Sequence, residues 1–325
     1  MSNNDTKPKG LCEQKCSKRE QDFRIKNHLL HPLECQNPFD KIAPRNRKPI
    51  RERMCKAYSR PAANQTIKIG DLRTSAALKE SLDYLLEVEE EFKLDSQWTL
   101  TYEFMADRFR AIRQDIIVQQ LNDASTSYLL EQMICFYVRA RDRSERLKTP
   151  TYNATLHSRE LDECLEREKQ KGYEFSIYFI PIHNPDIFAQ LRSQRDFIAK
   201  QTYRLLWDLF SAFVIQNYVR FFCLISKLDD PLQIQILMPA IKWIRLHAFE
   251  ALSASTKSPA CSVPLNDLNK WLKFLNDEML KKCADECFDK SPLHDEKTVK
   301  FHGCKMKAFE NSALLSYEWS LVNMN

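Results

Sequence analysis

Residues 102–115 read YEFMADRFRAIRQD, and their pattern sets the expected fold class. Apolar side chains recur every three or four positions, the spacing that aligns them on one face of an α-helix: Tyr102, Met105, Phe109, Ile112 and Ile116. Asp107, Arg110 and Gln114 then fall on the opposite face. A helix with one apolar face and one densely polar face is typical of a scaffold or binding helix, not of an active site.

Glycine is scarce, with four residues among 325 and no two of them within fifty positions of each other. Loops that hold phosphate groups need several glycines close together, because backbone N–H groups must approach the ligand. P-loop and dinucleotide-binding enzymes are therefore not expected. Long stretches rich in Leu, Glu, Lys, Arg, Gln and Ala favour α-helix, and the expected class is all-α.

Cysteine usage and hydropathy indicate a reducing compartment. The eleven cysteines lack the spacing of a disulfide framework, and the polar N-terminus carries no apolar signal segment. The most apolar run, residues 205–225, is interrupted by Asp208 and Arg220, and its longest uncharged piece, residues 209–219, is too short to span a bilayer. We interpret this run as a buried core helix and expect a nuclear or cytosolic protein without membrane association.

The formal net charge of +5 is concentrated in one segment. Residues 41–60 carry eight Lys and Arg against Glu52 alone, which sums to +7 and leaves −2 for the remaining chain. Such a segment can attract nucleic acid or an acidic partner. A solvated linker explains it equally well.

Three regions follow from the pattern of prolines and apolar spacing. Residues 1–60 are expected to form an extended basic arm, residues 61–252 a stacked helical array, and residues 253–325 a winged-helix module. In this module residues 264–275 and 278–288 predict two helices, and residues 298–302 and 305–309 alternate around Gly303 as a small β-hairpin would.

Several short motifs resemble the germinal-centre-associated nuclear protein (GANP) or suppressor-of-actin family. They are Arg60-Pro-Ala-Ala, Asp71-Leu-Arg-Thr, the string from Asp107 to Asp115, the element Cys12…Cys16…Glu20…Arg24…Glu34, and Asn217-Tyr-Val-Arg-Phe-Phe. The resemblance covers about residues 11–290, with a departure at Lys15-Cys16-Ser17, where the family usually continues Met-Cys-Pro. It implies a PCI-like array of stacked helices ending in a winged helix.

The resemblance also implies a function. Long members are scaffolds of a nuclear mRNA-export complex, paired with a PCI-domain protein and a small acidic peptide, and the paired winged helices bind nucleic acid. This chain resembles the short, domain-only branch, which is linked to centrosome duplication and the mitotic spindle. The nucleus is the expected location, with the cytoplasm, centrosome and spindle as further sites and centrosomal proteins as further partners.

The signature residues are expected to be structural. They are Arg60, Asp71, Arg73, Asp107, Arg108, Arg110, Arg113, Gln114 and Asp115. Charges on one helix usually pair within it or with neighbouring helices. We therefore expect Arg110 and Arg113 to bind adjacent carbonyl or carboxylate groups and to anchor the loop at residues 60–74.

Seven lysines of the terminal module are the candidate partner-binding residues: Lys270, Lys273, Lys281, Lys282, Lys300, Lys305 and Lys307. Lysines bind RNA or DNA phosphates without sequence preference. Nearby acidic residues partly cancel this charge, so ordinary solubility explains the lysines as well. The leading hypothesis is a non-enzymatic scaffold, and the alternative is a nucleic-acid-binding module acting through the winged helix and the basic arm.

Two groups of Cys and His allow a metal site on paper. One is Cys12, Cys16, His28, His31 and Cys35, whose spacing lies just outside the usual zinc-finger pattern, and the other is Cys283, Cys287, His294, His302 and Cys304. Packing in the core is the expected role of both groups. No local context singles out a cysteine nucleophile, so no catalytic residue, cofactor or metal is expected.

Overall fold

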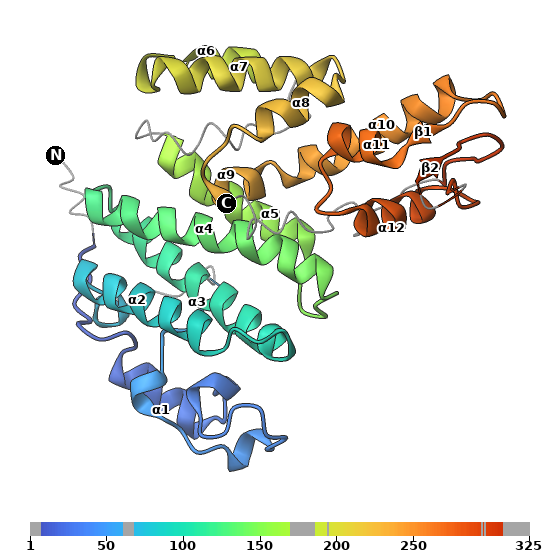
Figure 1. Ribbon diagram of the computed structural model, residues 1–325. Coiled ribbons are helices and arrows are strands. Elements are labelled where there is room, and N and C mark those ends of the chain that lie inside the picture. The colour runs from blue at the N-terminus through green and yellow to red at the C-terminus, as the bar shows by residue number, and fades with distance from the viewer. Residues whose placement is uncertain are drawn as a thin grey trace. The chain divides into compact units, whose positions relative to one another are not determined.

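The structure is a computed structural model that describes residues 8–60, 68–169, 186–193, 195–293, 295 and 297–307. These residues are predominantly helical, and the predicted all-α class is confirmed (Figure 1). Contacts divide the chain into two compact units, Met1–Glu168 and Lys169–Asn325, which we treat separately. The three regions expected from the sequence stay a prediction.

The N-terminal part of the first unit folds around a small core of its own. Helix α1 (Lys18–Lys26) is followed by short 3-10 helices: η1 (Pro32–Glu34), η2 (Pro44–Asn46), η3 (Arg51–Arg53) and η4 (Ile69–Asp71). Cys16, Leu30, Cys35 and Met54 are buried together there. A parallel bridge between Cys12 and Arg73 ties the start of the chain to the residues before the next helix. The described residues 8–60 therefore include a packed subdomain.

Four longer helices complete the first unit: α2 (Ser75–Glu91), α3 (Trp98–Gln119), α4 (Ala124–Arg146) and α5 (Ala154–Lys169). Helix α2 begins after Thr74, whose hydroxyl accepts a hydrogen bond from the Ala77 amide at 3.2 Å, as an N-cap should. Helices α2, α3 and α4 pack against one another. Helix α3 ends where Gln120 takes a left-handed conformation, with φ of 52°.

The apolar face predicted for α3 is confirmed. All five residues of the 102–116 stripe are buried, and the rings of Tyr102 and Phe109 contact Phe136 of α4. Burying each large apolar side chain contributes about 1.5–3 kcal/mol. The helix begins earlier than the sequence predicted, at Trp98, whose indole N–H donates to the Ser144 hydroxyl at 2.9 Å.

The second unit begins with α6 (Ile187–Ser193), α7 (Lys200–Val214), α8 (Tyr218–Ile225), α9 (Pro231–Ile236) and α10 (Met238–Ser255). Helix α7 packs on α6 and α8, and α10 packs on α8 and α9. Residues 205–225 are not one core helix but are divided between α7 and α8, close to the two helices that the pattern of residues 197–211 and 213–227 predicts. The chain turns at Gln216, where φ is 56°, and Asn217 caps α8 by accepting from the Arg220 amide at 3.0 Å.

The turn between α7 and α8 exposes apolar side chains. Val214, Ile215 and Val219 are 54%, 67% and 46% exposed, although they lie in the most apolar run of the chain. Residues 231–252, whose spacing of apolar side chains predicts one helix, are divided into α9 and α10 at Leu237. Pro239 follows this break, where its missing N–H costs no hydrogen bond.

The terminal module combines two helices with a very short sheet. Strand β1 (Val263–Pro264) leads into α11 (Leu265–Leu272) and α12 (Asp277–Cys287), and β2 (Thr298–Val299) pairs antiparallel with β1. The predicted hairpin, in which residues 298–302 pair with residues 305–309 around Gly303, is therefore wrong. Residues 298–299 pair with residues 263–264, Met306 bridges Phe288, and Phe309 lies outside the described residues. This helix–strand–helix–helix–strand order is that of a winged helix.

One fully buried arginine holds the core of this module together. Arg245 of α10 donates from Nε to the Leu272 carbonyl at 3.0 Å and from a terminal nitrogen to the Lys273 carbonyl at 2.6 Å. These carbonyls belong to the end of α11, which is short of intrahelical donors. The guanidinium also lies over the Phe274 ring, at 3.9 Å from its centre. Its burial lowers the pKa of Arg245 to about 10.

Candidate functional site

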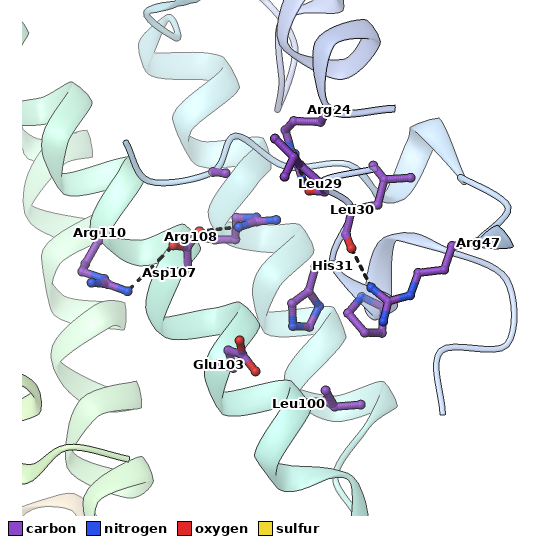
Figure 2. A pocket seen from close by; sticks show the side chains of 12 residues that line it. Arg24, Leu29, Leu30, His31, Arg47, Leu100, Glu103, Asp107, Arg108 and Arg110 are labelled. Carbon is purple, nitrogen blue, oxygen red and sulfur yellow. Dashed lines mark hydrogen bonds and ion pairs between the residues drawn. The ribbon is translucent and has the colours of Figure 1, made fainter. Parts of the chain in front are cut away.

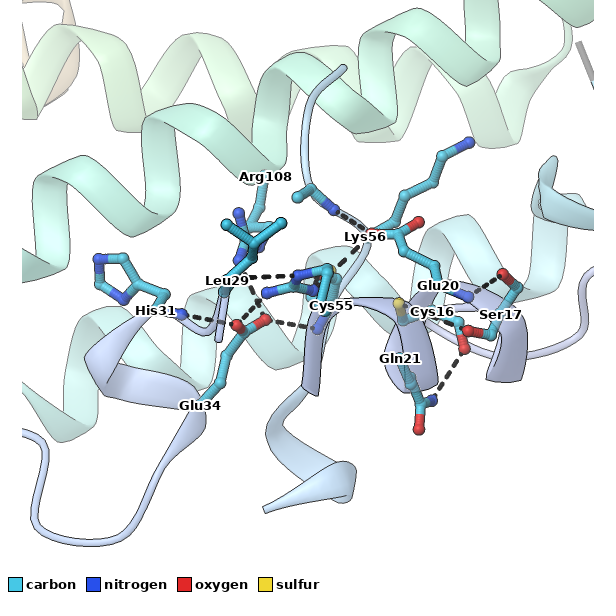
Figure 3. A network of polar contacts seen from close by, with 12 residues as sticks. Cys16, Ser17, Glu20, Gln21, Leu29, His31, Glu34, Cys55, Lys56 and Arg108 are labelled. Carbon is cyan, nitrogen blue, oxygen red and sulfur yellow. Dashed lines mark hydrogen bonds and ion pairs between the residues drawn. The ribbon is translucent and has the colours of Figure 1, made fainter. Parts of the chain in front are cut away.

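The most conspicuous polar site of the first unit is a buried carboxylate, that of Glu34. Its oxygens accept hydrogen bonds from Arg24, from Arg108 at 3.0 Å, and from the backbone amides of His31 at 3.1 Å and Cys55 at 3.3 Å (Figure 3). The Glu34 side chain is fully buried, and both arginine side chains are 5% exposed. One carboxylate thus joins α1, η1, the segment after η3, and α3.

The charges around Glu34 compensate one another. Burial by itself would lower the pKa of Arg108, but the carboxylates of Glu34 and Asp107 outweigh burial and raise it. Arg24 also donates to the Cys55 carbonyl at 3.1 Å, so its charge is satisfied from two sides. Removing one partner from such a buried pair typically costs about 3–5 kcal/mol, because the remaining charge has no counterion. The site is suited to holding the subdomain against α3.

A second buried carboxylate is that of Asp115, which lies about two helical turns after Arg108 on α3. It accepts from Lys56 Nζ at 2.6 Å and from Arg73 Nε at 2.8 Å. Both Asp115 and Arg73 are fully buried, and Arg73 also donates to the Ser81 hydroxyl at 3.1 Å. Lys56 Nζ also donates a hydrogen bond to the backbone carbonyl of Asp71 at 2.9 Å. This second cluster joins α3 to α2 and to the residues around η4.

Close backbone packing accompanies the second cluster. The amide of Gly10 donates to Gln119 Oε1 at 2.7 Å, and Gln119 Nε2 donates to the Arg73 carbonyl at 3.0 Å. A Cβ atom at Gly10 would lie 2.5 Å from that same carbonyl oxygen. Only glycine fits at this position without a shift of the backbone.

The polar face of α3 is covered by the chain that follows η3. Asp107 accepts from the Tyr58 amide at 3.1 Å, and Gln114 donates to the Ser59 carbonyl at 2.8 Å. Arg110 lies over the Tyr58 ring, 5.0 Å from its centre. This face therefore binds a segment of its own chain.

The two arginines expected to anchor α3 have different partners. Arg110 Nε donates to the Ala106 carbonyl at 3.4 Å within α3, and its guanidinium contacts the Tyr58 ring of the segment after η3. Arg113 instead pairs with Glu160, and with Glu163 at 3.1 Å, on α5. Asp71 accepts from the Ser17 hydroxyl at 2.6 Å and pairs with Arg19, whereas Arg60 is exposed.

The seven candidate lysines lie apart on the terminal module. Lys270 and Lys273 lie at the end of α11, Lys281 and Lys282 on α12, and Lys300, Lys305 and Lys307 after β2. Lys282 pairs with Glu278 at 3.1 Å. The outward face of α12 also carries Asp277, Asp285 and Glu286. Carboxylates are thus interleaved with the lysines on the helix that enters the DNA groove in winged-helix readers, and they would repel phosphates there.

The candidate metal residues differ in burial. Cys16 and Cys35 are buried, and burial raises the pKa of both thiols. His31 Nδ1 accepts from the Leu33 amide at 3.2 Å, and His28 lies exposed with φ of 56°. Across the described part of the chain, no three His, Cys, Asp or Glu side chains are grouped to hold a metal ion. His294 falls outside the described residues.

Comparison with known proteins fits this architecture. The profile of the SAC3/GANP family matches residues 15–289, which contain both buried carboxylates and α12. The chain belongs to the SAC3/GANP family. This confirms the resemblance found in the sequence. The family is one of scaffolds that work in complexes with other proteins.

The chain is similar to a small part of two longer proteins. It is 23% identical to Protein xmas of Drosophila melanogaster over 298 alignment positions, which cover 83% of this chain and 14% of that protein. It is 22% identical to SAC3 family protein B of Arabidopsis thaliana over 334 alignment positions, which cover 93% of this chain and 18% of that protein. The chain therefore spans less than a fifth of either relative.

Sequence reasoning on this SAC3/GANP chain missed the partners of its signature residues. Glu34 and Arg24 stood out only as part of a family motif, and Lys56 only as one charge of the basic segment. Gly10 carried a usable signal, since an isolated glycine in a glycine-poor chain often marks a close backbone approach. Nothing in the local pattern indicated which charges would meet.

None of the described helices of this SAC3/GANP chain combines the length and the apolar content that a bilayer-spanning helix requires.

Proposed function

We propose that the chain is a non-enzymatic scaffold of the mRNA-export type, which pairs through its terminal module with a PCI-domain protein and a small acidic peptide. The family match over residues 15–289 carries this proposal, because it covers the helical array together with the first elements of the module. Internal charge pairs occupy the conspicuous polar residues of α3. The first unit therefore supplies rigidity to the scaffold, and we assign pairing with the PCI-domain protein to the module.

Among its described residues, the terminal module has one exposed large apolar side chain for such pairing. Leu275, between α11 and α12, is 39% exposed and comes directly after the buried Phe274 and two positions after Lys273. An apolar residue surrounded by charge is typical of the centre of a polar protein–protein interface. Leu275→Asp is therefore the substitution that tests whether the partner docks here.

The experiment is co-purification of the tagged chain with its cellular partners. A PCI-domain protein and a small acidic peptide should be recovered with the wild-type chain and lost with Leu275→Asp. Leu156→Asp is the matched control, since Leu156 of α5 is 42% exposed in the first unit. Unchanged recovery with Leu275→Asp would reject the module as the docking surface. Recovery of centrosomal proteins without any PCI-domain protein would reject the export-type assembly.

That last outcome corresponds to a narrower proposal, a role in centrosome duplication and the mitotic spindle, with the protein located in the nucleus and at the centrosome. The support for it is the sequence resemblance to the short branch of the family. Imaging of the tagged chain through the cell cycle tests it. A nuclear signal that never concentrates at centrosomes or spindle poles would reject this role.

The second candidate function, nucleic-acid binding, is favoured by the basic segment near η2. Lys41, Arg45 and Lys48 are exposed, and the acidic residues of α12 have no counterpart among residues 41–48. We infer that any binding of RNA or DNA uses this segment in preference to α12. Replacing the three residues with Gln should then weaken binding of a single-stranded oligonucleotide. The slope of log affinity against log salt concentration should also become shallower, by the amount expected for the loss of about three phosphate contacts. An unchanged salt slope would reject this assignment.

A further inference from the structure

A cavity lies between the N-terminal subdomain and α3, in the first unit. Its volume is about 540 Å³, within the range of about 300–1,000 Å³ that ligand pockets occupy. Figure 2 shows side chains approaching it from two sides. Leu29, His31 and Arg47 come from the subdomain, and Glu103 and Arg110 come from α3.

Two residues that line the cavity, His31 and Arg108, each have a buried nitrogen atom without a partner. Within the described part of the chain, neither Arg108 Nε nor His31 Nε2 has a hydrogen-bond acceptor. The Arg108 side chain is 5% exposed, so this N–H group is shielded from bulk solvent. Leaving such a donor unsatisfied costs about 1–3 kcal/mol. Both atoms belong to residues that line the cavity.

The protonation of His31 makes it a donor. Burial, followed by the positive charges of Arg108, Arg47 and Arg24, lowers the pKa of His31 to about 3, so the ring is neutral. Its Nδ1 accepts from the Leu33 amide at 3.2 Å, which places the single proton on Nε2. Two residues of the cavity lining, from two different elements, therefore hold unsatisfied N–H groups just beneath its surface. An acceptor group of a bound ligand would satisfy them once the lining side chains adjust to it.

The other side chains that line the cavity indicate that its ligand is a peptide. Leu29, Leu30, Pro32 and Leu100 supply aliphatic surface, and no aromatic ring other than the His31 imidazole lines the cavity on which a nucleobase could stack. The Glu103 carboxylate can accept a hydrogen bond from a peptide N–H group, a donor that the sugar–phosphate backbone of a nucleic acid lacks. A peptide provides a carboxylate, aliphatic side chains and amide donors together.

We propose that this cavity binds a short segment of a partner protein in which an acidic side chain lies beside an aliphatic one. The carboxylate binds the guanidinium groups of Arg108 and Arg110 and the His31 Nε2–H. The aliphatic side chain packs on Leu29 and Leu100. This site lies in the first unit, so it is independent of pairing through the terminal module.

The test uses the full chain and a labelled, end-blocked peptide that alternates leucine with glutamate, with fluorescence anisotropy as the measurement. The same peptide with glutamine in place of glutamate should bind about tenfold more weakly, the loss expected for one charge-assisted hydrogen bond. Leu29→Ser and Arg110→Gln should each weaken the glutamate peptide by a similar factor. Leu29 is 56% exposed and the Arg110 side chain 25% exposed, so both variants should fold.

Matched controls separate the cavity from general surface charge. Leu94→Ser and Arg159→Gln replace a leucine that is 61% exposed and an arginine side chain that is 74% exposed, both away from the cavity. They should leave the affinity for the glutamate peptide unchanged. Equal effects of cavity and control variants, or no binding of this peptide, would overturn the proposal. So would an oligouridine strand that competes with the peptide and responds to the cavity variants, because the cavity would then bind nucleic acid.

Discussion

Replacing Glu34 with glutamine should destabilise the first unit more than any exposed charge change. The variant keeps the shape of the side chain but leaves Arg24 and Arg108 buried without a shared counterion. The expected loss is about 3–5 kcal/mol, a large fraction of the roughly 5–15 kcal/mol that stabilises a typical domain. With a urea dependence of about 1–3 kcal/mol per molar, the unfolding midpoint should fall by about 1–5 M.

The assay is urea unfolding followed by circular dichroism, combined with amide hydrogen exchange of peptides from α3, which reports the first unit alone. Glu163→Gln is the control. The Glu163 side chain is 36% exposed and pairs with Arg159 and Arg113, and its loss should cost less than about 1 kcal/mol. If the two variants shift the midpoint equally, the argument from buried charge is wrong.

A double-mutant cycle tests the pairing itself. Combining Glu34→Gln with Arg108→Met should be less damaging than the sum of the two single changes, because the second removes a charge that the first leaves unpaired. A coupling free energy above about 1 kcal/mol is expected for groups in direct contact. Additive effects would show that the 3.0 Å contact between these side chains carries no stabilisation.

Three further predictions concern other parts of the chain. Gly10→Ala should lower the melting temperature, at a cost of about 1–3 kcal/mol, because the added Cβ would lie 2.5 Å from the Arg73 carbonyl oxygen. Burial lowers the pKa of His157 from 6.5 to about 4, so its contribution is complete above pH 6.5 and is lost as the pH falls toward 4. In the His157→Gln variant the free energy of unfolding should therefore fall less between pH 6.5 and pH 4 than in the wild-type chain, by about 3 kcal/mol at most. Arg245→Leu should cost about 1–3 kcal/mol for each unsatisfied carbonyl at the end of α11, whereas the exposed Arg220→Leu should change stability by about 0.5 kcal/mol or less. Thermal unfolding checks all three, and an Arg245 variant as stable as the Arg220 variant would contradict the last.

Local spacing was sufficient to predict the core face of α3. Tyr102, Phe109 and Ile112 recur at the helical period and are buried, because a period of 3.6 residues alone determines which side chains share a face. The start of the helix was not predictable in this way. Residues 98–101 contain one aromatic and two β-branched residues with weak helix preference, and the burial of Trp98 against α4 extends the helix over them.

The turn between α7 and α8 in the second unit was hard to predict, because it lacks the glycine and proline residues that usually mark a turn. Gln216 takes the left-handed conformation instead. An apolar run without such breaks looks like one helix in the sequence. The pairing of β1 with β2 was missed for a related reason, since each strand has two residues and the paired residues lie 34 positions apart (Pro264 with Thr298) and 36 positions apart (Val263 with Val299).

The sequence by itself determined the family, the helical class and the face of α3 that enters the core. These depend on residue types and on spacing within one or two helical turns. Only the tertiary structure decided which charges are buried and which partners they have. Glu34 and Arg108 lie 74 positions apart, and a charge is stable in the interior only when an opposite charge arrives there with it. That condition is set by how distant segments meet, and no local pattern records it.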